Sequence, residues 1–566
     1  MARSRRDDRG AGNRWRRWWS RLPVVAFLVG PLVGLLGYTL LTRWQRPPPV
    51  TAAPLVSAPS RAFTDRLLVT LQDPSGVGEI RYTLDDSEPT DASRLYVSPI
   101  VVTETTQLAA RTFYGDGVDS QTVRRSYVHV DRAVAEFRST IPILLIDTLD
   151  QPIQRYRHHR AEPLPYIRSL FHVIEPDENG VAVVTAPAHV SCRAGVKARG
   201  SSTLGREKAS LRVELRDASD EDLDVSLLGL PAESDWVLLG PFEFDRALIR
   251  NALVYELARE TGRYAPRTRF VELFLNEYGG PFRGPVPEGS HYYGLYVLVE
   301  KVKRGADRVP VERLVVEDTE PPAVTGGDVL KVDRAGPGDK GFYAGGREIH
   351  HVYPKEAKIS PAQAAWIEEE VGALQAALRS SDFSDPEIGY ARYLDTPSAI
   401  DYHIINEFTK NPDSYVYSMY FHKRQDGKFI LGPVWDFDRT MGCDADRRSR
   451  NPHSESEYCF DFWYWRLFQD AEFKRRYSER WRELRQGPFD FEQLVARIDA
   501  LAREIEGAAE RNTARWGAEI GLDAGDWRTE IEQLKRWIEH RLVWFDRTFA
   551  SDTPVNPVPR RSGRRR

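Results

Sequence analysis

Two aspartates stand at either end of a short stretch in the second half of the chain. Asp413 lies in a polar turn, and Asp436 follows 23 positions later in a Trp-Asp-Phe-Asp motif. Between them, two apolar runs at 418–421 and 429–431 flank an Asp-Gly pair, which predicts a β-hairpin. This hairpin is short enough to bring both carboxylates to the mouth of one cavity.

Two carboxylates at one mouth suit phosphoryl transfer, which depends on positioning and charge neutralisation more than on covalent chemistry. In this interpretation Asp413 orients or deprotonates the acceptor hydroxyl. Asp436, with Asp438 on the same face of the segment, binds Mg²⁺, because hard cations prefer oxygen ligands. The alternative is a polar turn with aromatic anchors and satisfied aspartates, and the spacing alone does not decide between the two.

A small-residue turn upstream is a candidate for binding phosphates. Arg199, Gly200, Ser201 and Ser202 lie between two predicted strands. Such a turn lets backbone N–H groups approach phosphate oxygens, and an arginine adds bidentate charge. By itself the signal is weak, because a Gly-Ser turn beside an arginine is usually only a turn.

Two further residues extend the predicted nucleotide site. Lys208 precedes an alternating strand, from which a lysine reaches phosphates as a point charge. Glu300, followed by Lys301, closes the last strand of this region, where a hinge would hold the edge of an adenine. The alternatives are a solvated lysine at a strand edge and a surface salt bridge.

The order of the predicted elements indicates two lobes. The first lobe is rich in strands and contains one helix, 246–260, with Asp245 as its candidate N-cap. A region at 317–346, rich in glycine, proline and charge, is expected to be an elaborated loop. Beyond it the pattern is helical apart from the hairpin, an order that matches the two lobes of a protein kinase. The main-domain strands are predicted at 141–146, 211–215, 270–275 and 294–300, and further helices at 361–378 and 397–408.

Residues 62–131 precede this domain and contain short strands separated by Gly, Asp, Pro and Ser, which predict a small β-sandwich. A Tyr-Thr-x-Asp-x-Ser-x-Pro-Thr turn and a Tyr-x-x-Pro-Ile strand resemble the chitobiase/β-hexosaminidase C-terminal type of module. That resemblance implies an accessory or spacer domain. Asp85 and Asp86 of the turn are better explained as turn-forming residues than as metal ligands.

The N-terminus predicts a membrane anchor. Residues 23–42 form a charge-free run of 20, long enough to cross a bilayer as a helix, and eight arginines precede it. This excess of positive charge places residues 1–22 in the cytoplasm and the main domains outside the cell membrane. A cleaved signal peptide is the alternative. The Pro-rich residues 43–61 are expected to be a linker, and residues 551–566 a basic disordered tail.

Composition limits the classes of protein to which the chain can belong. With 566 residues, of which 41% are hydrophobic, it is expected to be globular with two or more domains. A net charge of −4 gives no reason to expect a nucleic-acid partner. The three cysteines lack metal-ligand spacing, and Cys443 and Cys459 either form a bridge or remain inert thiols.

Several ordered motifs of the main domain, 137–550, carry a second resemblance. They are Arg-Gly-Ser-Ser-Thr at 199–203, Ile-Arg-Asn at 249–251, the strand 293–300, Asn406-Glu407 with Asn411-x-Asp413, and Gly-Pro-Val-Trp-Asp-Phe-Asp at 432–438. Together they resemble the CotH kinase family of atypical kinase-like proteins. The resemblance implies phosphorylation of protein Ser or Thr with ATP and Mg²⁺ or Mn²⁺, Asp413 being the catalytic carboxylate and Asp436 a metal ligand.

One position departs from the pattern of that family. Five residues after the catalytic aspartate, many members place a metal-binding asparagine, and this chain has Ser418. A serine hydroxyl is a poorer Mg²⁺ ligand than an amide oxygen, and Asp438 is expected to compensate for it.

The sequence therefore predicts an α+β fold, in which a bilobal protein-kinase-like domain follows a small β-sandwich and an N-terminal transmembrane helix. The predicted activity is transfer of the γ-phosphate of ATP to exported or surface proteins. The alternatives are a non-catalytic surface protein that uses the same fold for binding, and another ATP-dependent modification such as adenylylation or glutamylation. Asp413, Asp436 and Lys208 favour an enzyme, whereas Ser418 and an exported location, where ATP is scarce, favour binding.

Overall fold

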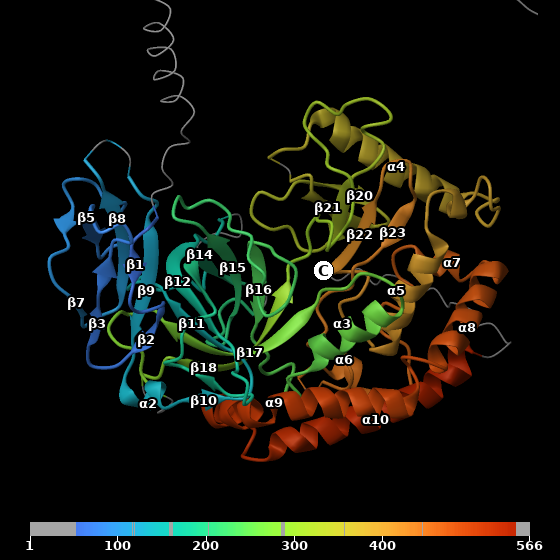
Figure 1. Cartoon of the computed structure of the whole chain (residues 1–566). Coiled ribbons are helices and arrows are strands. Elements are labelled where there is room, and N and C mark those ends of the chain that lie inside the picture. Colours follow the sequence, from blue (N-terminus) through green and yellow to red (C-terminus); the bar gives the residue numbers. More distant parts are fainter. Residues whose placement is uncertain are drawn as a thin grey trace, which may run out of the picture.

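The computed structural model describes residues 52–550 with the exception of 116, 118, 158–161, 202, 285–288, 356 and 444. The predicted cytoplasmic segment, anchor and basic tail, and residues 43–51 of the predicted linker, lie outside the described residues. Within them the chain is a mixed α/β protein with an N-terminal β-domain, a closed barrel and a second lobe of sheet and helices (Figure 1).

The length and composition of the described helices do not support the predicted transmembrane anchor. In the part of the chain that the structure describes, no helix is both long and apolar enough to cross a bilayer. The two longest, α9 (Phe491–Ile520) and α10 (Asp526–Phe549), are amphipathic, with many charged residues among their exposed positions. The predicted span, 23–42, lies outside the described residues. The described residues therefore contain no transmembrane helix, and they give the predicted single-pass localisation no support.

The N-terminal β-domain contains the predicted short strands. A five-stranded sheet, β2-β9-β8-β5-β6, is accompanied by the pairs β3-β7 and β1-β4 around a shared apolar core. Asp85 accepts hydrogen bonds from the Ser87 backbone and hydroxyl, as a turn-forming residue does. The strands are β1 (Leu55–Val56), β2 (Arg61–Phe63), β3 (Leu67–Val69), β4 (Leu71–Gln72), β5 (Glu79–Thr83), β6 (Arg94–Leu95), β7 (Ile100–Val102), β8 (Thr106–Phe113) and β9 (Val123–His129).

The β-domain is joined to the next domain by buried contacts. Asp86 is buried and forms ion pairs with Arg124 of its own domain and with Arg193 of the barrel. A second apolar cluster includes Val128 and Val130 of the β-domain together with Ile143 and Phe274 of the barrel. The two domains therefore share a core. Short elements at the junction are α2 (Arg132–Ala135), β10 (Arg138–Ser139) and β13 (Ala182–Val183).

Seven strands of the main domain close into a barrel, in the order β11-β12-β14-β15-β16-β18-β17. Neighbours are antiparallel except β11 and β17, whose parallel pairing completes the ring. This barrel corrects the predicted fold class: because β11 pairs on both sides, the first lobe of the expected kinase-like pair has no open edge. The strands are β11 (Ile143–Asp147), β12 (Ile167–Ile174), β14 (Val190–Arg199), β15 (Ser210–Arg216), β16 (Asp235–Leu239), β17 (Thr268–Asn276) and β18 (Tyr292–Glu300).

The predicted helix of the first lobe is shorter than expected. Helix α3 (Arg250–Glu260) begins four residues after the predicted start, and Ile249 occupies its N-cap. Asp245 lies further back, where its carboxylate accepts a hydrogen bond from the backbone of Arg250 and pairs with its guanidinium at 3.0 Å. The buried ion pair therefore replaces the expected side-chain cap.

A five-stranded sheet, β20-β21-β19-β22-β23, forms the centre of the second lobe. The predicted hairpin is confirmed as the antiparallel pair β22 (Met419–Lys423) and β23 (Phe429–Leu431). The expected loop at 317–346 is wrong in part, because β19 (Asp328–Val332) lies there between β21 (Arg347–Tyr353) and β22. The edge strand β20 (Gly341–Ala344) also begins inside that region.

Helices enclose the second lobe and extend beneath the barrel. The long helices α9 and α10 run side by side along one end of the molecule, and α9 contacts β18 of the barrel (Figure 1). Cys192, Cys443 and Cys459 are free thiols, so the possible bridge between the last two is not formed. The remaining helices are α4 (Pro361–Arg379), η2 (Tyr390–Arg392), α5 (Thr396–Phe408), α6 (Arg447–Arg450), α7 (Tyr464–Leu467) and α8 (Ala471–Arg485).

Candidate active site

A cavity of about 370 Å³ lies between the barrel and the second lobe. This volume is within the range of small-ligand sites. Residues from both predicted halves of the site line it, namely Arg199, Gly200 and Ser201 from the barrel and Asp413, Ser418, Asp436 and Asp438 from the second lobe. Segments more than 200 residues apart in the chain therefore form one chamber.

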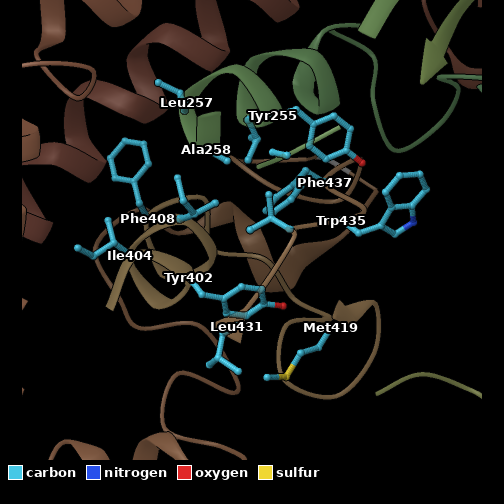
Figure 2. Close-up of a cluster of buried hydrophobic side chains, with 14 of the residues drawn as sticks. Tyr255, Leu257, Ala258, Tyr402, Ile404, Phe408, Met419, Leu431, Trp435 and Phe437 are labelled. Atoms are coloured by element: carbon cyan, nitrogen blue, oxygen red, sulfur yellow. The ribbon is translucent and has the colours of Figure 1, made fainter. Parts of the chain in front are cut away.

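The Trp-Asp-Phe-Asp segment is held by helix α3. The backbone N–H of Phe437 donates to Asn251 Oδ1 at 2.9 Å, and that of Asp436 donates to the Tyr255 hydroxyl at 3.2 Å. Trp435 and Phe437 lie beside Tyr255 in the buried cluster, so the aromatic side chains anchor the segment (Figure 2). Asp436 has a φ of 70°, and both carboxylates of the motif line the cavity.

The carboxylates of this motif carry charge that the protein compensates only in part. Burial raises the pKa of Asp436, the nearby charge of Arg199 opposes that rise, and the charge of Asp413 adds to it. Burial and the neighbouring Asp436 raise the pKa of Asp438 well above its usual range. The Ser418 hydroxyl donates to Asp436 Oδ2 at 3.3 Å. A cation placed here would relieve the repulsion between the two carboxylates.

Two arginines position Asp413, and each of them also pairs with a neighbouring aspartate, Asp446. Its carboxylate lies 3.4 Å from Arg448 and 3.6 Å from Arg439. Asp446 pairs with the same arginines, at 2.6 Å and 3.4 Å respectively. The backbone N–H of Asp413 also donates to Asn411 Oδ1 at 3.1 Å, which fixes the turn that carries it.

The barrel wall opposite these acids is basic. Lys197 and Arg199 of β14 and Arg212 of β15 line the cavity. Lys197 and Arg212 were not among the predicted site residues. The alternation Val196-Lys197-Ala198-Arg199, which puts both cations on one face of a strand, is the signal that could have found Lys197.

Lys208 and Glu300 do not reach this cavity. The Lys208 ammonium is buried, and it donates to Asn512 Oδ1 of α9 at 2.6 Å and to the Pro241 carbonyl at 2.7 Å. It faces a smaller neighbouring cavity, which Asp438 also lines. Glu300 pairs with Arg267 at 2.6 Å, but it is buried, so this is not the surface salt bridge that the sequence left open. Ser202 lies outside the described residues.

Comparison with known families agrees with this arrangement. The family described as CotH kinase protein matches residues 196–545, which is more than half of the chain. The chain belongs to the CotH kinase family. A second family, described as the chitobiase/beta-hexosaminidase C-terminal domain, matches residues 59–124, so both sequence resemblances are confirmed. No curated protein matches the chain. The chain is thus a CotH-type, kinase-like protein preceded by a domain of the chitobiase/beta-hexosaminidase C-terminal family.

The site of this CotH-family chain fits a divalent cation held jointly by protein and phosphate. Among the described residues, no three His, Cys, Asp or Glu side chains are grouped so that they could hold a metal ion. Asp436, Asp438 and Ser418 offer two carboxylates and a hydroxyl. Mg²⁺ is usually bound by one or two carboxylates together with substrate phosphates rather than by a cage of protein ligands. The donor set therefore suits Mg²⁺ or Mn²⁺ in the presence of a nucleotide.

Proposed function

We propose that this protein transfers the γ-phosphate of ATP to a hydroxyl group of a protein acceptor. One observation supports this proposal above the others: the cavity has a basic wall on the barrel and an acidic wall on the second lobe. A polyphosphate would fit against the first wall, and the carboxylates of the second wall would hold a metal ion that neutralises its charge. Such a chamber supplies the positioning and charge neutralisation on which phosphoryl transfer depends.

Each group of residues has a role in this reaction. The barrel cations would bind the phosphate oxygens, and Asp436, Asp438 and Ser418 would hold the metal. Bound Mg²⁺ neutralises the charge that develops on the phosphate oxygens. Asp413 orients the acceptor hydroxyl and accepts its proton, while the new O–P bond forms and the bond between the γ-phosphorus and the oxygen of the ADP leaving group breaks.

Labelled ATP tests this function in the full-length chain. With Mg²⁺ or Mn²⁺ and candidate acceptor proteins, label from the γ-phosphate is expected on protein, and chelation of the metal is expected to abolish it. Label from the α-phosphate would instead indicate adenylylation. If the chain binds no nucleotide with either metal, every ATP-dependent function is contradicted. The remaining hypothesis is then a non-catalytic binding protein with a kinase-like fold.

Replacing Ser418 by asparagine is expected to raise the transfer rate several-fold at limiting Mg²⁺. Ser418 has a φ of 53°, a conformation that asparagine adopts more readily than serine, so the backbone should tolerate the change. An amide oxygen at this position would be a better metal ligand than the hydroxyl. The measurement is initial rate against Mg²⁺ concentration, with Ser418→Ala as the matched control. A rate for Ser418→Asn below that of Ser418→Ala would mean that the side chain does not contact the metal.

A further inference from the structure

The sheet of the second lobe has one closed edge and one open edge. At the β23 edge, the N–H of Phe429 donates to the Tyr393 carbonyl at 2.7 Å, and its carbonyl accepts from the N–H of Asp395 at 2.8 Å. At the other edge, β20 pairs with β21 alone. Within the described part of the chain, no hydrogen bond from outside this pair reaches residues 341–344. The β20 edge can therefore accept another strand.

The turn that follows β20 determines which of its backbone groups point outward. The Gly-Gly turn at 345–346 has φ values of 60° and 76°, as a type I′ hairpin turn requires. In such a hairpin the residues that flank the turn exchange both hydrogen bonds, and bonded and non-bonded pairs then alternate along the strands. Ala344 and Phe342 therefore bond to β21. The N–H and carbonyl groups of Gly341 and Tyr343 point away from the sheet.

This edge lacks most of the features that protect an exposed strand. Natural edge strands are short, carry proline or a charged residue, or are covered by another segment. The sequence of β20 is Gly-Phe-Tyr-Ala, so the strand is short but contains neither proline nor charge. Phe342 and Ala344 are buried in the core of the lobe, whereas Tyr343 is 78% exposed. The strand is therefore firmly anchored while its outer side stays accessible.

The open edge is continuous with a wall of the cavity. Residues that lie opposite each other on neighbouring strands share one face of a sheet. The register places in one row, across β22, β19, β21 and β20, the residues Tyr420, Lys331, His350 and Gly341. Tyr420 and Lys331 line the cavity, and so do most residues of the loop 333–340, which joins β19 to β20. One face of the sheet therefore extends from the cavity to the open edge.

We infer that an extended segment of the acceptor protein pairs with β20 as an additional antiparallel strand. The inference rests on the proposed function, from which it takes the acceptor. Main-chain hydrogen bonds hold a strand that is added in this way, and contacts of alternate side chains, here with Tyr343, add selectivity. Because β20 runs away from the loop 333–340, an antiparallel segment runs toward this loop and the cavity. The Ser or Thr that receives the phosphate therefore lies C-terminal to the paired residues.

A substrate segment suits this edge better than a second copy of the chain. The outward groups belong to Gly341 and Tyr343, which lie about 7 Å apart along the strand. Pairing over this length involves only a few residues of the added strand, whereas a stable dimer interface usually buries more than about 1,000 Å². Weak pairing is suitable for an acceptor, because the product must leave after each transfer.

Labelling of degenerate peptides by the full-length chain tests the inference. Each peptide carries one Ser or Thr and is supplied with γ-labelled ATP and Mg²⁺ or Mn²⁺. A methyl group is placed on one backbone nitrogen at a time, which removes a donor and blocks strand pairing at that residue. At alternate positions on the N-terminal side of the acceptor residue, N-methylation is expected to lower labelling about tenfold. On the C-terminal side it is expected to have little effect.

Tyr343→Pro is the corresponding change in the protein. Proline removes the outward N–H of residue 343 and leaves the hydrogen bonds between β20 and β21 in place, because edge strands tolerate proline on their solvent side. Tyr343→Val keeps the N–H and is the matched control for loss of the aromatic ring. Relative to this control, Tyr343→Pro is expected to raise the KM for peptide about tenfold and to leave kcat and Mg·ATP affinity unchanged. A thermal melt checks that both variants fold, and the N-methyl scan of the wild type needs neither of them.

The outcomes separate this inference from the proposed function. If the wild type labels peptides but the two variants share one KM, or if N-methylation on the N-terminal side has no effect, the edge does not bind the acceptor and the proposed function stands. A dimer of the wild type that Tyr343→Pro dissociates in sedimentation would also overturn the inference, because a second copy would then cover the edge. If the wild type binds no nucleotide and labels no peptide, the proposed function fails and the inference fails with it.

Discussion

Replacing Asp436 by asparagine is expected to lower phosphate transfer by about 10²- to 10³-fold or more, as does the loss of a group that stabilises transition-state charge. Its carboxylate faces the cavity beside Asp438, where the metal would bind, and an amide cannot supply the negative charge. The fold should survive, because the carboxylate accepts a single hydrogen bond from the described residues, that of Ser418. Asp436 is exposed to the cavity, so an amide of nearly the same size is expected to be accommodated there.

The measurement pairs γ-labelled transfer with a thermal melt of the same preparation. Asp426→Asn, at the exposed tip of the same hairpin, is the matched control for the change of charge. Asp436→Asn should also lose the Mg²⁺-dependent part of its ATP affinity, since the protein's share of the metal site is removed. Transfer equal to that of the control would exclude Asp436 as a metal ligand, and a collapsed melt would make it a structural residue.

The local unit of the site could be predicted from the sequence because its signals are local. An Asp-Gly between two apolar runs specifies the hairpin, and the Trp-Asp-Phe-Asp alternation specifies which side chains enter the core. The structure places Asp413 and Asp436 on one cavity, as the spacing predicted. That they act as base and metal ligand remains a prediction.

The basic half of the site was harder to predict because it depends on which cations remain unpaired. A sequence does not show that Lys208 donates a hydrogen bond to Asn512, 304 residues away, or that Glu300 pairs with Arg267. The basic wall could be detected only in part, since the partner strand of β14 must be known before Arg212 can be placed opposite Lys197. Long-range pairing, rather than residue type, decides which cation faces the ligand.

The prediction of the fold class was wrong for a related reason. The apolar run at β11 was recognised as a strand, but a run of this kind carries no information about its two neighbours. Its pairing with both β12 and β17 closes the barrel. Strand β19 was missed because it is five residues long and lies among glycines and charges, where turn signals dominate.

Helix α3 connects the two halves of the molecule more directly than its sequence suggests. Arg250 donates to the Thr440 carbonyl at 3.0 Å, and Asn251 and Tyr255 bind the backbone of the Asp-Phe-Asp segment. Contacts from two successive turns of α3 therefore fix the Trp-Asp-Phe-Asp segment to the barrel lobe. A shift of this helix would therefore move Asp436 relative to the basic wall of the barrel.

Replacing Asp413 by asparagine is expected to lower transfer by about 10²- to 10⁴-fold, the usual contribution of a general base, and to leave Mg·ATP affinity unchanged. The fold should be retained because Arg439 and Arg448 keep their ion pairs with Asp446 when the Asp413 charge is removed. Measuring transfer, Mg·ATP affinity and melting temperature together separates this variant from Asp436→Asn, which should lose transfer and metal-dependent affinity alike. Equal losses of affinity in the two variants would mean that Asp413 binds the metal or the nucleotide. Loss of the cooperative melt in Asp413→Asn would mean that this carboxylate serves the fold, and that the proton of the acceptor hydroxyl goes elsewhere.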